Sequence, residues 1–111
     1  MATGTIIPQL KQSCTILTEW RNNWTNNGQC FFAVTGHVAH IHATIRNGTA
    51  TTGTEIADVT SAYAPSTATL APILKSSGVG NGYVQINTQG KVTINSVTDN
   101  TSVLFDLFWA I

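Results

Sequence analysis

The sequence has 111 residues, a formal net charge of zero and 9% charged residues, against roughly 25% in an average soluble protein. A chain of this length forms one domain with a single core. It contains no run of Lys or Arg and no uninterrupted apolar stretch long enough to span a bilayer. The composition therefore gives no basis for binding nucleic acid or for membrane insertion.

The first residues differ from the rest of the chain. Residues 1–12 contain a glycine and a proline and have no hydrophobic period, so we expect an extended lead-in or attachment segment. They also lack a basic region followed by an apolar one, so no signal peptide is predicted. We expect residues 13–111 to form a single domain. It begins with a strand expected over residues 14–20, and Asn26-Asn27-Gly28 then signals a turn.

The middle of the chain has the composition of short strands. Residues 29–45 are dense in β-branched and aromatic residues, and Gly36 near their centre indicates a bulge, a bend or a tight turn between two strands. Further strands are expected from the Thr-rich start of residues 49–58 and from the apolar residues 70–74. The irregular segments expected around them are Tyr63-Ala64-Pro65 and the glycine-rich residues 76–82.

The last third contains the clearest pattern. Residues 84–87 and 92–95 alternate with period two around Thr88-Gln89-Gly90, which predicts a hairpin. About eight short strands with polar turns and no convincing helix predict an all-β fold. The expected architecture is an antiparallel β-sandwich or jelly roll.

Residues 103–111 are apolar on both faces of the predicted last strand. Such a strand needs a second body to bury against, so we expect an oligomer interface. Its candidate residues are Leu104, Phe105, Asp106 and Phe108. Asp106 interrupts the apolar run, and burial of its carboxylate would require a partner, either Arg46 or a histidine. We interpret Asp106 as structural, at the interface, rather than catalytic.

Aromatic residues beside amides are the candidates for a ligand site, because aromatic rings stack on sugars and amides bond the hydroxyls. The candidate ligand-binding residues are Asn23, Trp24, Asn26, Tyr63 and Tyr83. Trp24 has two interpretations: an exposed sugar-stacking ring among asparagines, or a core residue, as tryptophans in small β domains mostly are. Trp109, in the final strand, is expected in the core.

His40 and His42 share one face of a predicted strand. Two imidazoles with this spacing reach one transition metal, and three chains on a threefold axis would supply an octahedral site. The alternatives are polar residues on a partly solvated strand, or buried histidines bonded to their neighbours. No other cofactor is expected. Cys14 and Cys30 are expected as reduced thiols, with Cys30 buried, and a disulfide between them is the alternative.

A family likeness follows from the order of these motifs over residues 24–111. Trp24-Thr25-Asn26-Asn27-Gly28 leads into a strand with Gly36. Asn47-Gly48-Thr49, Gly53-Thr54-Glu55, a Tyr63-x-Pro65 corner and the glycine-turned hairpin at Gly90 then follow. This order resembles the C-terminal head domain of tailed-bacteriophage receptor-binding and tail-fibre proteins. In that family the corner is usually preceded by Leu-Pro and carries Arg or Lys before its proline, whereas Asp58-Val59 and Ala64 stand here.

The resemblance implies a homotrimeric β-sandwich head, located in the virion at a tail tip or fibre. Such a head adheres to a bacterial surface saccharide without catalysis and contacts other phage tail proteins. Trimeric phage fibres also include tips in which His-x-His pairs hold a metal. A second reading is a purely structural virion or tail-assembly protein. A third is a small cell-wall glycan hydrolase dependent on Asp58 or Asp106, although no Gly-x-Ser-x-Gly nucleophile motif occurs.

Overall fold

A computed structural model describes residues 13–75 and 78–111 and confirms the predicted all-β, antiparallel class. The described residues include a single 3₁₀ turn and no α-helix, so they contain no helix able to cross a membrane. The elements are β1 (Ser13–Ile16), β2 (Thr25–Asn26), β3 (Phe31–Thr35), β4 (Val38–Arg46), β5 (Thr54–Asp58), η1 (Ser61–Tyr63), β6 (Thr69–Lys75), β7 (Gly78–Ile86), β8 (Lys91–Asn95) and β9 (Val103–Ala110). The lead-in expected for residues 1–12 lies outside the described part.

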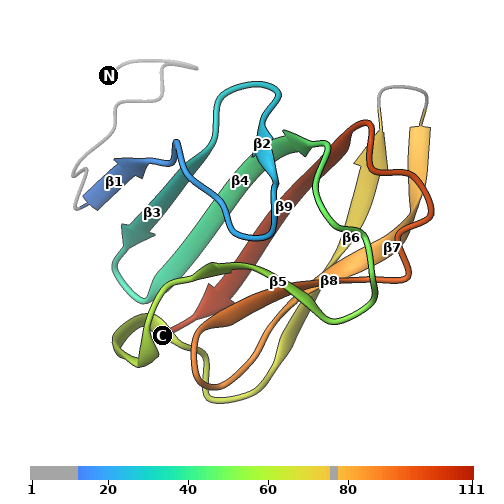
Figure 1. The fold of residues 1–111 in the computed structure, drawn as a ribbon. Coiled ribbons are helices and arrows are strands. Elements are labelled where there is room, and N and C mark those ends of the chain that lie inside the picture. Colours follow the sequence, from blue (N-terminus) through green and yellow to red (C-terminus); the bar gives the residue numbers. More distant parts are fainter. Residues whose placement is uncertain (1–12, 76–77) are drawn as a thin grey trace, which may run out of the picture.

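The strands form one curled sheet in the order β1-β3-β4-β9-β6-β7-β8-β5, and β2 pairs with the end of β4. Among the described residues, the junction between β9 and β6 is a single residue pair, Leu74 opposite Leu104. The sheet bends at this junction, and β5 and β8 lie across the sheet formed by β3, β4 and β9 (Figure 1). We call β1, β3, β4 and β9 the first layer, and β6, β7, β8 and β5 the second layer.

Alternating side chains fill the space between the two layers. In β9, Phe105 and Leu107 are fully buried, whereas Asp106 and Phe108 between and beyond them are exposed. β4 alternates in the same way, and its Ile41 packs in the same core as Ile94 of β8. The predicted division of the last strand into two faces is therefore confirmed. The core lies against the face that carries Phe105 and Leu107, and not against the face that carries Asp106 and Phe108.

The structure selects among open alternatives in one segment and differs from the sequence-based assignment in another. Gly36 lies in a tight turn with φ 60°, which separates β3 from β4 and selects one of the three conformations expected there. β7 already begins at Gly78, so most of the loop expected over residues 76–82 is strand. Glycines carry no hydrophobic period, and pairing with β6 overrides their weak strand preference.

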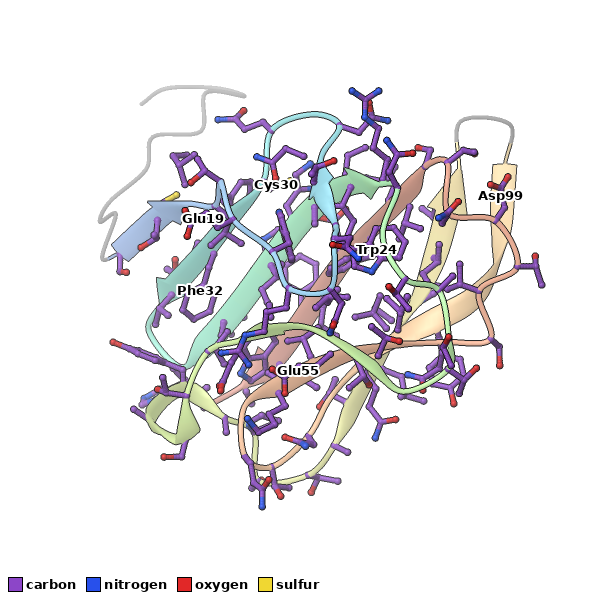
Figure 2. All side chains as sticks on the ribbon, in the orientation of Figure 1. Glu19, Trp24, Cys30, Phe32, Glu55 and Asp99 are labelled. Carbon is purple, nitrogen blue, oxygen red and sulfur yellow. The ribbon has the colours of Figure 1, made fainter. Side chains whose placement is uncertain are left out.

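Trp24 is a central core residue that fixes the chain leading out of β4. Its side chain is 2% exposed, and its indole Nε1 donates to the carbonyl oxygen of Thr49 at 3.0 Å. Gly48 lies directly against the ring, so that a Cβ at this position would overlap the indole. Figure 2 shows Trp24 between the strands and the segment that follows β4. The Trp-Thr-Asn and Asn-Gly-Thr motifs thus form one packing unit.

We predict that Trp24→Ala lowers the free energy of unfolding by about 3–5 kcal/mol, because it leaves a large cavity in the core. Chemical denaturation monitored by far-UV circular dichroism measures this. Leu70→Ala is the matched control: Leu70 is 59% exposed, and its truncation is expected to change stability by about 0.5 kcal/mol or less. Equal effects of the two substitutions would contradict the assigned role of Trp24.

Candidate binding surface

Six side chains from three strands form a regular array on the outer face of the first layer. Strand register places Phe31, His42 and Asp106 in one row across β3, β4 and β9. The neighbouring row is formed by Ala33, His40 and Phe108. Side chains directly opposite one another in antiparallel strands point to the same face. We call these six residues the outer array.

The centre of the outer array is a carboxylate held by two imidazoles. Asp106 Oδ1 lies 2.8 Å from His40 Nε2 and 2.8 Å from His42 Nδ1. His42 lies directly opposite Asp106, whereas His40 lies in the neighbouring row, opposite Phe108. The two histidines reach the same carboxylate oxygen through different ring nitrogens. Within the described part of the chain, Asp106 Oδ2 has no hydrogen-bond partner. The Asp106 side chain is 44% exposed, so the carboxylate is partly open to solvent.

Aromatic rings surround this carboxylate. The Phe108 ring stacks on His40 with centroids 3.9 Å apart and an interplanar angle of 13°. Phe31 stacks on His42 at 5.4 Å and meets His40 edge-on at 5.2 Å. Phe108 is 55% exposed, so a large part of its surface is open to solvent. The surface therefore combines a flat apolar ring with a hydrogen-bond acceptor on the same strand.

The electrostatic environment keeps Asp106 ionised. Partial burial acts to raise its pKa, but hydrogen bonds from His40 and His42, together with their charges, outweigh this and lower the pKa below its usual range. The predicted histidine partner of Asp106 is therefore confirmed. A carboxyl group with a lowered pKa accepts hydrogen bonds at neutral pH and is poorly suited to donate a proton.

Two of the five expected ligand residues are engaged elsewhere, and a third lies in an exposed turn. Trp24 as a sugar-stacking ring is wrong, since its side chain is in the core. Asn26 Oδ1 accepts from Trp20 Nε1 at 2.6 Å, and its amide nitrogen donates to the Leu17 carbonyl at 2.8 Å. Asn23 is an exposed turn residue with φ 71°. The amide cluster therefore organises a turn around a buried tryptophan.

The two tyrosines are exposed but are not brought together. Tyr63, 42% exposed, belongs to η1, and its carbonyl oxygen accepts from Trp109 Nε1 at 2.7 Å. Tyr83, 37% exposed, lies on β7 in the second layer, opposite Pro72. The predicted core position of Trp109 is confirmed, because it is 4% exposed. The five expected ligand residues thus do not form one site.

The expected interface residues divide between the two faces of β9. Asp106 and Phe108 are exposed on the outer face, and Leu104 on the same face is half-buried. Phe105 as an interface residue is wrong: it is 0% exposed and packs in the core of the single chain. The alternation of β9 is the reason, because neighbouring residues on a strand point in opposite directions.

Sequence reasoning placed the two histidines on one face but missed Phe31. A tight turn at Gly36 sets the register, with Thr35 opposite Val38, and Phe31 opposite His42 follows by counting.

Among the described residues, no three His, Cys, Asp or Glu side chains are arranged to hold a metal ion. Both cysteines are free thiols; Cys14 is exposed and Cys30 is buried.

A second charged cluster is placed on β5 and β8 in the second layer. Glu55 pairs with Arg21 and, at 3.4 Å, with Lys91 Nζ; Asp58 lies 3.2 Å from the same ammonium group. A hydrogen bond from the Thr60 N–H and another from Lys91 lower the pKa of Asp58. Figure 2 shows Glu55 on the strand that lies across the first layer. The four charges tie the edge strand β5 to its neighbours.

No protein-family model matches this sequence, and no curated protein matches it. The function therefore has to be inferred from the chemistry of the described residues.

We predict that Asp106→Asn lowers stability at pH 7 by on the order of 1 kcal/mol or less, as expected for half-exposed ion pairs. The folded-state pKa of Asp106 is lowered. Its stabilising contribution is therefore complete above the ordinary aspartate pKa and is lost as the pH falls through the lower folded-state value. Denaturation of both proteins at pH 7 and pH 3 measures this. A difference in stability that grows on acidification would contradict the prediction.

Proposed function

We propose that the chain is a non-catalytic binding module, an adhesin-type head domain of a phage tail, which holds a bacterial surface saccharide on the outer array. One observation supports this above the others. Asp106 is fixed by two imidazoles through one oxygen, its second oxygen is free of described partners, and an exposed Phe108 ring lies two residues along the same strand. In this role the module belongs to the virion, beside other tail proteins.

The chemistry of the outer array suits a sugar ring. The apolar C–H face of a pyranose packs against an exposed aromatic ring, and its hydroxyl groups donate to a carboxylate. The stack of Phe108 on His40 and the two imidazole bonds hold the ring and the carboxylate in place before a ligand arrives. Such preorganisation reduces the entropy that is lost on binding.

The acid–base properties of the chain support a binding role over hydrolysis. A glycoside hydrolase needs one carboxylic acid with a raised pKa to protonate the leaving group. The two aspartates considered for that role, Asp58 and Asp106, both have lowered pKa values. Each is also bonded to basic side chains, which favours the ionised form of the carboxylate.

A second candidate occupant of the same face is another copy of the chain, as in a homotrimer or a structural tail-assembly protein. Ile16, Val38 and Phe108 all lie on the outer face of the first layer and are about half exposed, between 48% and 55%. Exposed apolar patches commonly mark protein interfaces. In a trimer around this face, His40 and His42 of three copies would approach one axis, where a metal would add to the contact.

We predict that Phe108→Ala and Asp106→Asn each weaken binding on a bacterial-glycan array by about tenfold, because a stacked ring or a hydrogen bond to a charged group contributes on the order of 1–2 kcal/mol. Leu70→Ala is the matched control, since Leu70 is equally exposed but lies on the second layer. It is expected to leave binding unchanged. Unaltered glycan binding by both outer-array variants would overturn the proposed site.

Light scattering distinguishes the two occupants of the outer face. A stable trimer that Phe108→Asp dissociates, together with no glycan hit, would replace the adhesin by the assembly protein. Repeating the measurement with a chelator tests the metal on the threefold axis. Phe105→Asp is not informative about the interface, because Phe105 lies in the core and its substitution unfolds the chain.

A further inference from the structure

The edge strand β1 has backbone groups without a partner among the described residues. All four residues of β1 are exposed, and within the described part of the chain β1 pairs with β3 alone. Leu17 N donates to the Cys30 carbonyl at 2.9 Å, which sets the phase of this ladder. Because hydrogen-bonded residues alternate along an antiparallel strand, Ser13 and Thr15 also face β3. The N–H and C=O groups of Cys14 and Ile16 therefore point away from the sheet.

The opposite edge of the sheet is protected in several ways. The Arg21 N–H donates to the Ile56 carbonyl at 3.0 Å, and the Asn22 side chain donates to the Glu55 carbonyl at 2.6 Å. β5 also contains a register shift between Glu55 and Ala57 and carries the charged cluster. Bulges, charges and covering segments are the usual means of preventing edge-to-edge pairing. β1 contains no charge, no proline and no register shift.

We propose that β1 pairs with β1 of a second copy of this chain, antiparallel and about a twofold axis, with Cys14 of each copy opposite Ile16 of the other. Within Ser13–Ile16, this register pairs both outward-pointing residues of one copy with both of the other, so both cross-strand pairs exchange two backbone hydrogen bonds. Thr15 meets Thr15 of the second copy on the axis, a favourable cross-strand pair. The strand is uncharged, so no like charges meet.

This pairing has a geometric consequence for the outer array. Cys14 and Ile16 project from the same face as Phe31 and Ala33, their cross-strand partners in β3. Residues opposite one another across the new pair again share a face, so the outer arrays of both copies point to the same side. If the proposed saccharide function holds, two sites then face one surface, and binding to a polymeric glycan gains avidity. The pairing itself does not depend on that function.

A cysteine cross-link tests the register directly. Residues of a hydrogen-bonded antiparallel pair have Cα atoms about 5.5 Å apart, which is within the range of a disulfide. Ile16→Cys places a thiol opposite the native Cys14 of the second copy, and mild oxidation is expected to give a covalent dimer on a non-reducing gel. The control is Ile16→Cys combined with Cys14→Ser, which removes the partner thiol and is expected to give no covalent dimer on the same gel.

A proline substitution tests the pairing without oxidation. The Ile16 N–H points outward, so Ile16→Pro removes a bond to the second copy and preserves the ladder with β3. Sedimentation equilibrium is expected to show a concentration-dependent dimer for the native chain and a monomer for Ile16→Pro, with unchanged circular dichroism. Leu70→Lys, on the second layer, should leave the dimer intact.

The proposal is overturned if the native chain is monomeric across the concentration range and Ile16→Cys gives no covalent dimer. A different oligomer that Ile16→Pro leaves unchanged would also overturn it. Loss of glycan binding in Phe108→Ala without any β1 pairing would overturn this proposal and leave the saccharide function standing. A dimer paired through β1 that binds no glycan would overturn the saccharide function and leave the β1 pairing standing.

Discussion

The pairing of β4 with β9 is the interaction on which the rest of the structure depends. Its register runs without interruption from Val38 opposite Ala110 to Ile45 opposite Val103. Along both strands every second side chain enters the core, and Ile41 and Phe105 among them are fully buried. A slip of one residue would move these apolar side chains to the outer face and bury Asp106. The hydrophobic core and the outer array are therefore two results of the same register.

The two charged clusters of the chain differ in what surrounds them. On β5 and β8, carboxylates pair with Arg21 and Lys91, and these contacts tie down an edge of the sheet. On β9, Asp106 pairs with imidazoles that are themselves stacked against phenylalanine rings. The stacked imidazoles hold the Asp106 carboxylate in one orientation on an open surface. This contrast is why the first layer, and not the charged second layer, is the better candidate for recognition.

The curled sheet also separates the surfaces available for different contacts. The bend at Leu74 and Leu104 directs the outer face of the first layer away from β5 and β8. The unprotected strand β1 borders this same face, whereas the protected strand β5 ends the other layer. A contact along β1 therefore extends the face that carries the outer array and leaves the core untouched. The arrangement is consistent with a module that works in more than one copy.

Much of the fold was available from the sequence, because strand periodicity is a local property. The hairpin of β7 and β8, the terminal strand and its two faces follow from period-two alternation, as does the shared face of His40 and His42. Composition correctly predicted an all-β chain, since short polar turn residues replace charged ones. The sequence also predicted a partner for the Asp106 carboxylate, either Arg46 or a histidine, and the structure selects the histidines.

The tertiary structure decided the features that depend on residues distant in sequence. Trp24 became a core residue because Gly48 leaves room for its ring and Thr49 accepts its N–H. Phe31 joined the outer array through the tight turn at Gly36, and Phe105 left the expected interface because the second layer covers it. Local composition specifies which residues can pair or pack. Which of them meet is set by strand register and by the folding of one layer over the other, since both minimise exposed apolar area over the whole chain.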